Sequence, residues 1–230
     1  MGESRLRTEK KSRQRAAFAK MSPSARLRLG AGLSAVGQAL LVREKAAPHA
    51  DGPPEPFKTL ATVLAILRRS RTPHALIGGW AVNAWGVARA TADVDILADY
   101  PRPPRRLLAA LDEDLAAEWK PGDVDDPIDG LIRASSRQSP WLQIDLLRAV
   151  KTADLRALER ATQVDLEGLE IPLVRPEDLL AMKLQAGGGL DWQDAQAVYG
   201  VQRGKIDEAL IEQACRERRV LDRLARLRRR

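Results

Sequence analysis

Three aspartates have the types and spacing of a divalent-cation site. Asp93 and Asp95 flank a single valine in a segment whose alternation of polar and apolar residues predicts a strand. Both carboxylates therefore project from one face of that strand. Two carboxylates this close repel each other, and each shifts the pKa of the other, unless positive charge lies between them. Mg²⁺ prefers oxygen ligands and supplies that charge. The alternative is a strand with a solvated acidic face.

The third aspartate, Asp145, lies in the apolar segment 141–147, WLQIDLL, which also predicts a strand. A charged side chain in an apolar strand is unfavourable unless it is paired or bound to a metal. If this strand lies beside that of Asp93 and Asp95, three carboxylates converge. Three carboxylates suffice for two Mg²⁺ ions, which activate a nucleophile and stabilise a pyrophosphate leaving group. Asp93, Asp95 and Asp145 are therefore the predicted metal ligands and catalytic residues.

A pair of glycines precedes these aspartates. The apolar segment 73–77 predicts a short strand, Gly78 and Gly79 follow it directly, and residues 80–88 predict an Ala-rich helix. Glycines let a ligand approach the backbone closely, and the start of a helix offers free N–H groups and the positive end of the helix dipole. This arrangement favours phosphate binding at Gly78 and Gly79, although Gly-Gly turns are common.

These residues form one spaced pattern together with a basic residue and a threonine. Its members are Gly78, Gly79, Arg89, Thr91, Asp93, Asp95 and Asp145. The pattern resembles the signature of the nucleotidyltransferase superfamily, in particular that of AbiEii-type toxins of toxin–antitoxin systems and of aminoglycoside-nucleotidyltransferase-like proteins. The resemblance covers roughly residues 72–200. It implies a nucleotidyltransferase fold, an NTP substrate and transfer of an NMP to a hydroxyl group.

A downstream block, in which a helical lysine precedes an Asp-rich helix, extends the resemblance. It implies that Lys183 reaches the triphosphate and that Asp191 or Asp194 orients the triphosphate or the acceptor. Many relatives carry a basic residue immediately before the first of these aspartates, where this chain has Leu190. The three glycines at 187–189 are expected to form a mobile loop.

Three further residues have two interpretations each. Arg89 is expected to end the helix before the Asp93 strand, where it either forms a salt bridge with one of the paired aspartates or contacts phosphate. Thr91 is expected to cap or order the turn that follows. Trp192 is the candidate for stacking on a nucleobase, although an indole more often fills a core. Arg89 and Thr91 are therefore placed in support of the nucleotide site.

The charge of the chain is unevenly distributed. The net charge of +7 arises from two basic ends, +8 over residues 1–47 and +6 over residues 216–230, around a middle part of −7. Basic ends favour a polyanion, whereas an acidic middle with clustered aspartates favours divalent cations. RNA, such as a tRNA end, is therefore an expected partner through the termini; the alternative is that both ends are solvated arms or helix faces. The resemblance to toxins adds a cognate antitoxin.

Local patterns divide the chain into four segments. Residues 1–46 predict a basic helical extension, 47–56 a Pro- and Gly-rich linker, 57–175 a nucleotidyltransferase core and 176–230 a helical C-terminal region. The core is expected to be α/β (α+β), with a short mixed sheet flanked by helices. Strands are expected at 73–77, 93–99, 131–134, 141–147 and 168–174, and helices at 57–71, 80–88, 105–117, 152–161, 176–185, 191–199 and 206–230.

Composition excludes several classes of protein. A single cysteine, Cys215, rules out an internal disulfide and a Cys-based zinc site, and two histidines leave too few ligands for a His-based metal centre. The apolar stretch 27–42 is too short and too polar to span a membrane. We expect a soluble cytoplasmic enzyme. The alternatives are an aminoglycoside-like small-molecule nucleotidyltransferase, a non-catalytic nucleotide- or RNA-binding member of the fold, and an interaction protein with basic arms.

Overall fold

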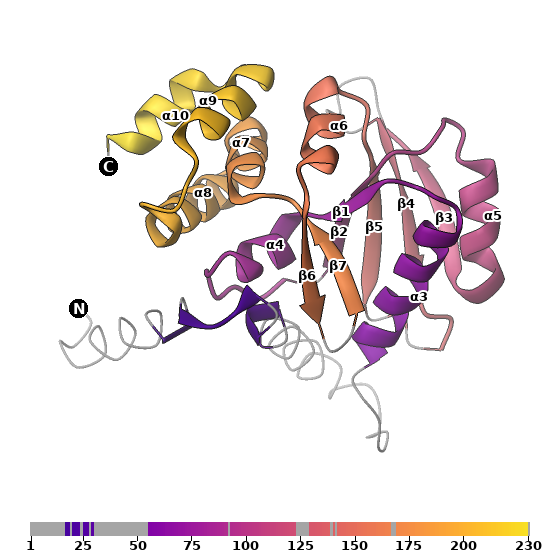
Figure 1. The fold of residues 1–230 in the computed structure, drawn as a ribbon. Helices are drawn as coiled ribbons and strands as arrows, with labels where there is room; N and C mark the ends of the chain where they lie inside the picture. The colour runs from indigo at the N-terminus through magenta and orange to yellow at the C-terminus, as the bar shows by residue number, and fades with distance from the viewer. Residues whose placement is uncertain are drawn as a thin grey trace.

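The computed structural model shows a mixed α/β protein (Figure 1). The described residues are 17–18, 20–23, 25–27, 29, 55–91, 93–122, 129–138, 140, 142–166 and 169–229. The expected linker up to residue 54, Trp141 and most of the loop expected at 120–129 lie outside them.

Strands from distant parts of the chain form one seven-stranded sheet in the described part of the protein. Its strands are β1 (His74–Leu76), β2 (Asp93–Ala98), β3 (Ala116–Pro121), β4 (Gly130–Ser135), β5 (Gln143–Arg148), β6 (Thr162–Leu166) and β7 (Leu169–Leu173). The spatial order is β3-β4-β5-β2-β1-β7-β6. Two of the pairings, β2 with β5 and β1 with β7, are parallel and the others antiparallel, so the sheet is mixed, as the sequence predicts.

The central strand β2 has one apolar and one acidic face. Val94 and Ile96 are buried, whereas Asp93 and Asp95 alternate with them and are half-buried. The parallel register with β5 sets Asp95 directly beside Asp145. The period-two pattern of β2 and this register therefore place the predicted ligands on the same face of the sheet.

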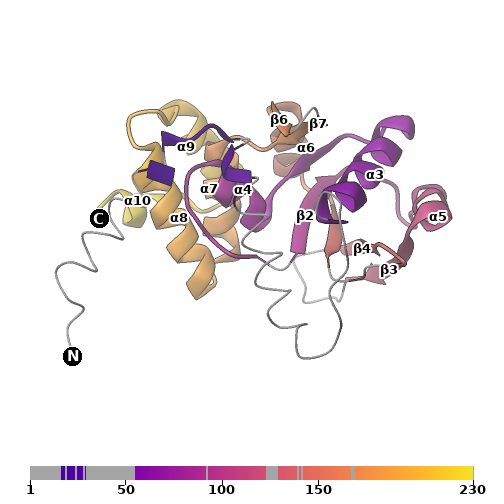
Figure 2. The ribbon, with the colours of Figure 1, turned by 90° about the horizontal axis from the view of Figure 1, so that it is seen from below.

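The helices form two groups, seen in both views (Figures 1 and 2). On one side, α3 (Glu55–Arg69) contacts α5 (Arg105–Asp114) beside the sheet. On the other side, α7 (Pro176–Ala186) contacts α8 (Gly189–Gln202), α9 (Glu208–Glu217) and α10 (Leu221–Arg228). Helix α4 (Gly78–Ala84) contacts both β2 and α7, and α6 (Thr152–Glu159) contacts α9. The C-terminal helices thus lie next to the helix that begins at the glycine pair.

The described part of the N-terminal extension packs against the rest of the protein. Phe18 and Leu27 are buried, and Arg26 is only 7% exposed. The Arg26 guanidinium donates to the Met21 carbonyl (2.9 Å) and to the Ala84 carbonyl, where α4 ends. A cation at the last carbonyls of a helix is electrostatically favourable. These contacts join the extension to the helix of the glycine pair.

Several boundaries differ from the expectations. The helix expected at 105–117 ends at Asp114, because the chain continues as β3. Neither β3 nor β6 is among the strands expected from the sequence. The helix expected at 80–88 begins at Gly78 and ends at Ala84. The helix expected at 206–230 is two helices, since Arg219 adopts a φ of 58° between them. Within the described part of the chain, no helix combines the length and apolar character that a membrane crossing requires.

Candidate active site

The three predicted metal ligands converge at one place on the sheet. Asp93, Asp95 and Asp145 each offer a carboxylate oxygen, and these oxygens lie within 4.8 Å of one another. Two of the residues belong to β2 and the third to β5, its parallel neighbour. The structure therefore brings the three carboxylates close enough together to share one ligand.

Gly78 provides the space that this cluster needs. Its φ of +62° lies in the left-handed region that favours glycine, and a Cβ there would lie 1.9 Å from Oδ2 of Asp95. The preceding residue, Ile77, donates its backbone N–H to the Asp95 carbonyl at 2.9 Å, which ties the turn to β2. Any side chain at position 78 would therefore displace the Asp95 carboxylate.

Gly79 lies against the side chain of Thr91 and leaves no space there for a side chain of its own. A Cβ at Gly79 would lie 2.7 Å from the Thr91 hydroxyl oxygen. That hydroxyl donates to the Asp93 carbonyl at 3.3 Å. Thr91 thus contributes to the order of the segment that leads into β2.

The acidic cluster carries more negative charge than its immediate surroundings balance. Burial, and then the charges of Asp93 and Asp145, raise the pKa of Asp95 to about 6. The positive charges of Lys183 and Arg89 act in the opposite direction on the pKa of Asp95, so both lie within electrostatic reach of the cluster.

Ion pairing separates Asp93 and Asp95 from the buried aspartates. Asp178 and Asp194, which are at most 4% exposed, pair with arginine or lysine. Asp145 is also buried and pairs with an arginine. Among the described residues, neither Asp93 nor Asp95 forms an ion pair.

This donor set fits a divalent cation. Hard carboxylate oxygens are the ligands that Mg²⁺ selects, and two oxygens on opposite sides of the ion are about 4 Å apart. The spread of 4.8 Å is slightly wider, and small rotations of the carboxylates would close it. A dication would also relieve the repulsion that raises the pKa of Asp95. Asp93, Asp95 and Asp145 are therefore suitable ligands for Mg²⁺.

Arg133 is a residue of this site that the sequence analysis does not identify. Its Nε donates to Oδ1 of Asp145 at 2.8 Å, and its Nη2 donates to Oδ2 of Asp145 at 2.7 Å. The two residues are direct partners in the antiparallel pairing of β4 with β5. The charge of Asp145 inside an apolar strand is thus compensated by an arginine of the neighbouring strand.

Lys183 lies in a network of ion pairs beside the cluster. Its Nζ is 2.8 Å from Oδ1 of Asp191 and 3.0 Å from Oδ2 of Asp194. Arg89 also donates to Oδ2 of Asp194, so this arginine pairs with an aspartate of α8 and not with the paired aspartates of β2. The side chain of Asn83 holds the backbone of Arg89 through two hydrogen bonds of 2.8 Å. The network joins α7, α8 and the segment that precedes β2.

Glycines connect α7 and α8 where a mobile loop is expected. Gly187, with a φ of +70°, caps α7, Gly188 precedes α8, and α8 begins at Gly189, so the connection is short. Leu190, which follows this connection, is 54% exposed. The guanidinium of Arg226 lies 4.8 Å from the ring centroid of Trp192, and this partly buried indole packs against the hydrophobic core.

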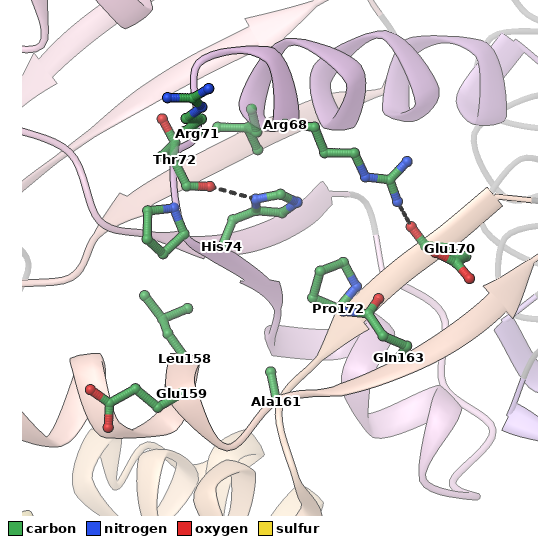
Figure 3. Close-up of a pocket in the computed structure, with 12 residues that line it drawn as sticks. Arg68, Arg71, Thr72, His74, Leu158, Glu159, Ala161, Gln163, Glu170 and Pro172 are labelled. Carbon is green, nitrogen blue, oxygen red and sulfur yellow. Dashed lines mark hydrogen bonds between the residues drawn. The ribbon is translucent and has the colours of Figure 1, made fainter.

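A groove of about 630 Å³ lies apart from the acidic cluster (Figure 3). It is lined by the ends of α3 and α6, the start of β1, and the strands β6 and β7. In it, Nδ1 of His74 is 2.8 Å from the Thr72 carbonyl, and Arg68 donates to the Glu170 carbonyl. His74 pairs with Ala98, so it lies on the face of the sheet opposite to that of Asp95. The groove therefore does not belong to the candidate active site.

Comparisons with known proteins concern the overall architecture. No protein-family model matches the chain, and no curated protein sequence matches it. An antigenic nucleotidyltransferase-like protein from Paracoccidioides brasiliensis is 16% identical, with 78% of this chain and 95% of that chain covered and a TM-score of 0.45. ANT(2'')-Ia in complex with adenylyl-2''-tobramycin is 13% identical, with 68% of this chain and 95% of that chain covered and a TM-score of 0.47. Terminal uridylyl transferase 4 from Trypanosoma brucei with bound GTP is 13% identical, with 75% of this chain and 57% of that chain covered and a TM-score of 0.35. The solved structures similar to this chain thus include proteins described as nucleotidyltransferases.

Proposed function

We propose that this protein is a Mg²⁺-dependent nucleotidyltransferase, which transfers an NMP from an NTP to a hydroxyl group and releases pyrophosphate. The observation that carries the proposal is the convergence of three carboxylates from two parallel strands, opposite a glycine that a side chain could not replace. Without a bound cation, the repulsion among these carboxylates would lower the stability of the protein without any function to offset that loss. A cluster that binds a dication explains why Asp93 and Asp95 have no ion pair among the described residues.

Each carboxylate has a distinct part in this proposal. Asp93 and Asp95 would hold two Mg²⁺ ions, and Asp145 would hold the catalytic one. When bound, the metal neutralises charge on the transferring phosphoryl group and on the leaving pyrophosphate. Asp145 also orients the acceptor hydroxyl and accepts its proton. Gly78 and Gly79 are the proposed backbone contacts of the phosphates.

Lys183 and Arg89 are the proposed cations for the triphosphate. The ammonium group of Lys183 has three N–H donors, of which Asp191 and Asp194 take two. One donor therefore remains for a phosphate oxygen without loss of either ion pair. In the proposal, Asp191 and Asp194 fix the position of this lysine, and Asp194 does the same for Arg89.

The first acceptor to test is RNA, in particular a tRNA end, because both ends of the chain are strongly basic. A toxin-like role with a cognate antitoxin would follow from that acceptor. A polycationic small molecule of the aminoglycoside kind is the second, because the middle part of the chain has a charge of −7.

The test is incubation of the full chain with each α-³²P-labelled NTP, Mg²⁺ and one acceptor class at a time. The acceptor classes are total tRNA, protein and aminoglycosides. We expect label in one class, no label in EDTA, and none with the double variant Asp93→Asn and Asp95→Asn. Asp99→Asn, an exposed aspartate directly after β2, is the matched control and should retain transfer.

Two results would contradict the proposal. Transfer that survives the double substitution would remove the metal mechanism. Mg²⁺-dependent nucleotide binding without transfer to any acceptor would instead favour a non-catalytic binding protein.

A further inference from the structure

We infer that Arg133 is a positioning residue of the acidic cluster, which holds Asp145 by both oxygens and supplies one fixed positive charge to the metal site. The inference rests on the proposed function, since it concerns the same three carboxylates. It adds a fourth member, from a third strand, that the signature of glycines and aspartates does not contain.

The contact between the two side chains is a bidentate fork. Nε of Arg133 donates to Oδ1 of Asp145 at 2.8 Å, and Nη2 of Arg133 donates to Oδ2 at 2.7 Å. Both hydrogen bonds are short. Such parallel bonds fix the plane of a carboxylate as well as its position. The side chain of Asp145 is 7% exposed and that of Arg133 is 30% exposed. The carboxylate of the fork is therefore nearly enclosed, whereas its arginine is partly exposed.

The register of four strands produces this arrangement. Glu118, Arg133, Asp145 and Asp95 are successive partners across β3, β4, β5 and β2. Glu118 is largely exposed and lies 2.8 Å from Lys120, so Asp145 is the principal partner of Arg133. The carboxylates of Asp145 and Asp95 are thus neighbours on one side, and the arginine is the neighbour of Asp145 on the other.

The charge of Arg133 changes what the cluster requires. Three carboxylates carry a formal charge of −3, and the arginine reduces it to −2. Lys183 and Arg89 do not alter this balance, because Asp191 and Asp194 match their charges. Arg133 therefore lowers the repulsion among the aspartates before any metal binds, and it weakens the attraction of the site for the metal.

These two effects of Arg133 have opposite consequences when the residue is replaced. In Arg133→Gln, Asp145 loses its fixed orientation, so transfer should become slower. The same change makes the site more negative, so Mn²⁺, a spectroscopic substitute for Mg²⁺, should bind more tightly. A single and a double charge about 6 Å apart in a solvent-like medium interact enough to change an equilibrium about tenfold. A residue with only a structural role would not tighten the binding of a metal.

The experiment measures the dissociation constant of Mn²⁺ on the full chain without NTP, and kcat and KM for transfer, in a set of variants. Arg133→Gln should bind Mn²⁺ about tenfold more tightly and lose at least tenfold in kcat. Arg133→Lys retains the charge but not the fork, so its Mn²⁺ affinity should equal that of the wild type while kcat stays low. Arg137→Gln, which removes an exposed arginine paired with Asp112, should change neither quantity.

A double variant keeps the test decisive if Arg133→Gln folds poorly, because it leaves neither member of the ion pair without its partner. Arg133→Gln with Asp145→Asn removes both charged partners and returns the site to a formal charge of −2, so Mn²⁺ should bind no more tightly than in the wild type. Unchanged or weaker Mn²⁺ binding in Arg133→Gln, tighter binding in the double variant, or full transfer in Arg133→Lys would overturn the inference.

Failure of the inference can be told apart from failure of the proposed function. If the wild type binds Mn²⁺ but transfers no nucleotide, the proposed function fails, and the Mn²⁺ series still decides the role of Arg133. If the wild type binds no Mn²⁺, both are overturned.

Discussion

Asp95 provides a direct test of the energetic cost of the acidic cluster. Burial and the charges of Asp93 and Asp145 raise the pKa of Asp95 from 3.8 to about 6. The folded protein therefore binds this proton more tightly than the unfolded chain. Stability decreases as the pH rises from about 3.8 to about 6, and above that window the full cost is present. At about 1.36 kcal/mol per pKa unit, the cost is roughly 3 kcal/mol of unfolding free energy.

Asp95→Asn should remove this cost. In EDTA at pH 7.5, the variant should melt about 6–12 °C above the wild type, given about 2–4 °C per kcal/mol for a chain of this size. At pH 4, where most of the carboxyl is protonated in the folded protein and about half in the unfolded chain, the gain should fall to roughly 0.5 kcal/mol. The assay is thermal unfolding followed by circular dichroism at both pH values, with transfer measured on the same preparations.

The matched control is again Asp99→Asn, whose side chain is exposed and whose melting temperature should stay within about 2 °C of the wild type. Mg²⁺ should raise the melting temperature of the wild type, because it binds the folded state, and should have little effect on Asp95→Asn. A variant that melts below the wild type at pH 7.5, or a gain that is equally large at pH 4, would refute the electrostatic reasoning.

Three further predictions concern residues around and outside the cluster. Gly78→Ala should abolish detectable transfer, because its Cβ would lie 1.9 Å from a carboxylate oxygen of β2, whereas Gly204→Ala, with a similar positive φ but open space around it, should retain transfer. Asp178→Asn removes the buried carboxylate that accepts two hydrogen bonds from the half-buried Arg160, which keeps its contact with Glu217, and should cost about 1–3 kcal/mol in urea unfolding, whereas Asp112→Asn, in an exposed pair, should cost about 0–1 kcal/mol. Burial lowers the pKa of His74 below its usual 6.5, so the contribution of His74 becomes unfavourable as the pH falls through that value, and the stability of the wild type relative to His74→Asn should be lower at pH 5.5 than at pH 7.5 in urea midpoints.

The central part of the sheet was predictable because its pattern is local. The alternation around Asp93 and Asp95 identifies β2, and the apolar run before the glycine pair identifies β1. The convergence of Asp145 with this pair was predicted only on the condition that its strand neighbours β2, and the structure shows this parallel pairing. The strands themselves needed only short-range periodicity and the polarity of single side chains.

The two edge strands were not predictable from periodicity. Strands β3 and β6 lie at opposite ends of the sheet. Residues 116–121 of β3 are all at least partly exposed, and in β6 Val164 is buried among exposed neighbours. An edge strand covers little apolar surface and often carries charge or proline, as β3 does at Pro121. Its sequence therefore resembles a helix end or a loop.

Arg133 illustrates a different limit. The segments 131–134 and 141–147 are both predicted strands, and the structure pairs them as neighbours. Which residues face each other depends on the register of the hairpin, and a shift of one residue would place the arginine on the other face. The turn residues 135–140 contain no Asn-Gly or Asp-Gly pair that would fix this register. The signal that could have identified Arg133 is a lone cation in one apolar strand opposite a lone anion in the next.

The distribution of ion pairs indicates where this chain sacrifices stability. Asp178 and Asp194 are the most deeply buried aspartates, and each pairs with a cation of the chain. Asp145 has its own arginine, whereas Asp93 and Asp95 are half-buried, adjacent and unpaired among the described residues. A chain selected for stability alone could have replaced either with an uncharged residue. Their retention, with a glycine that accommodates one of them, is the pattern expected where binding a cation matters more than the stability that the carboxylates cost.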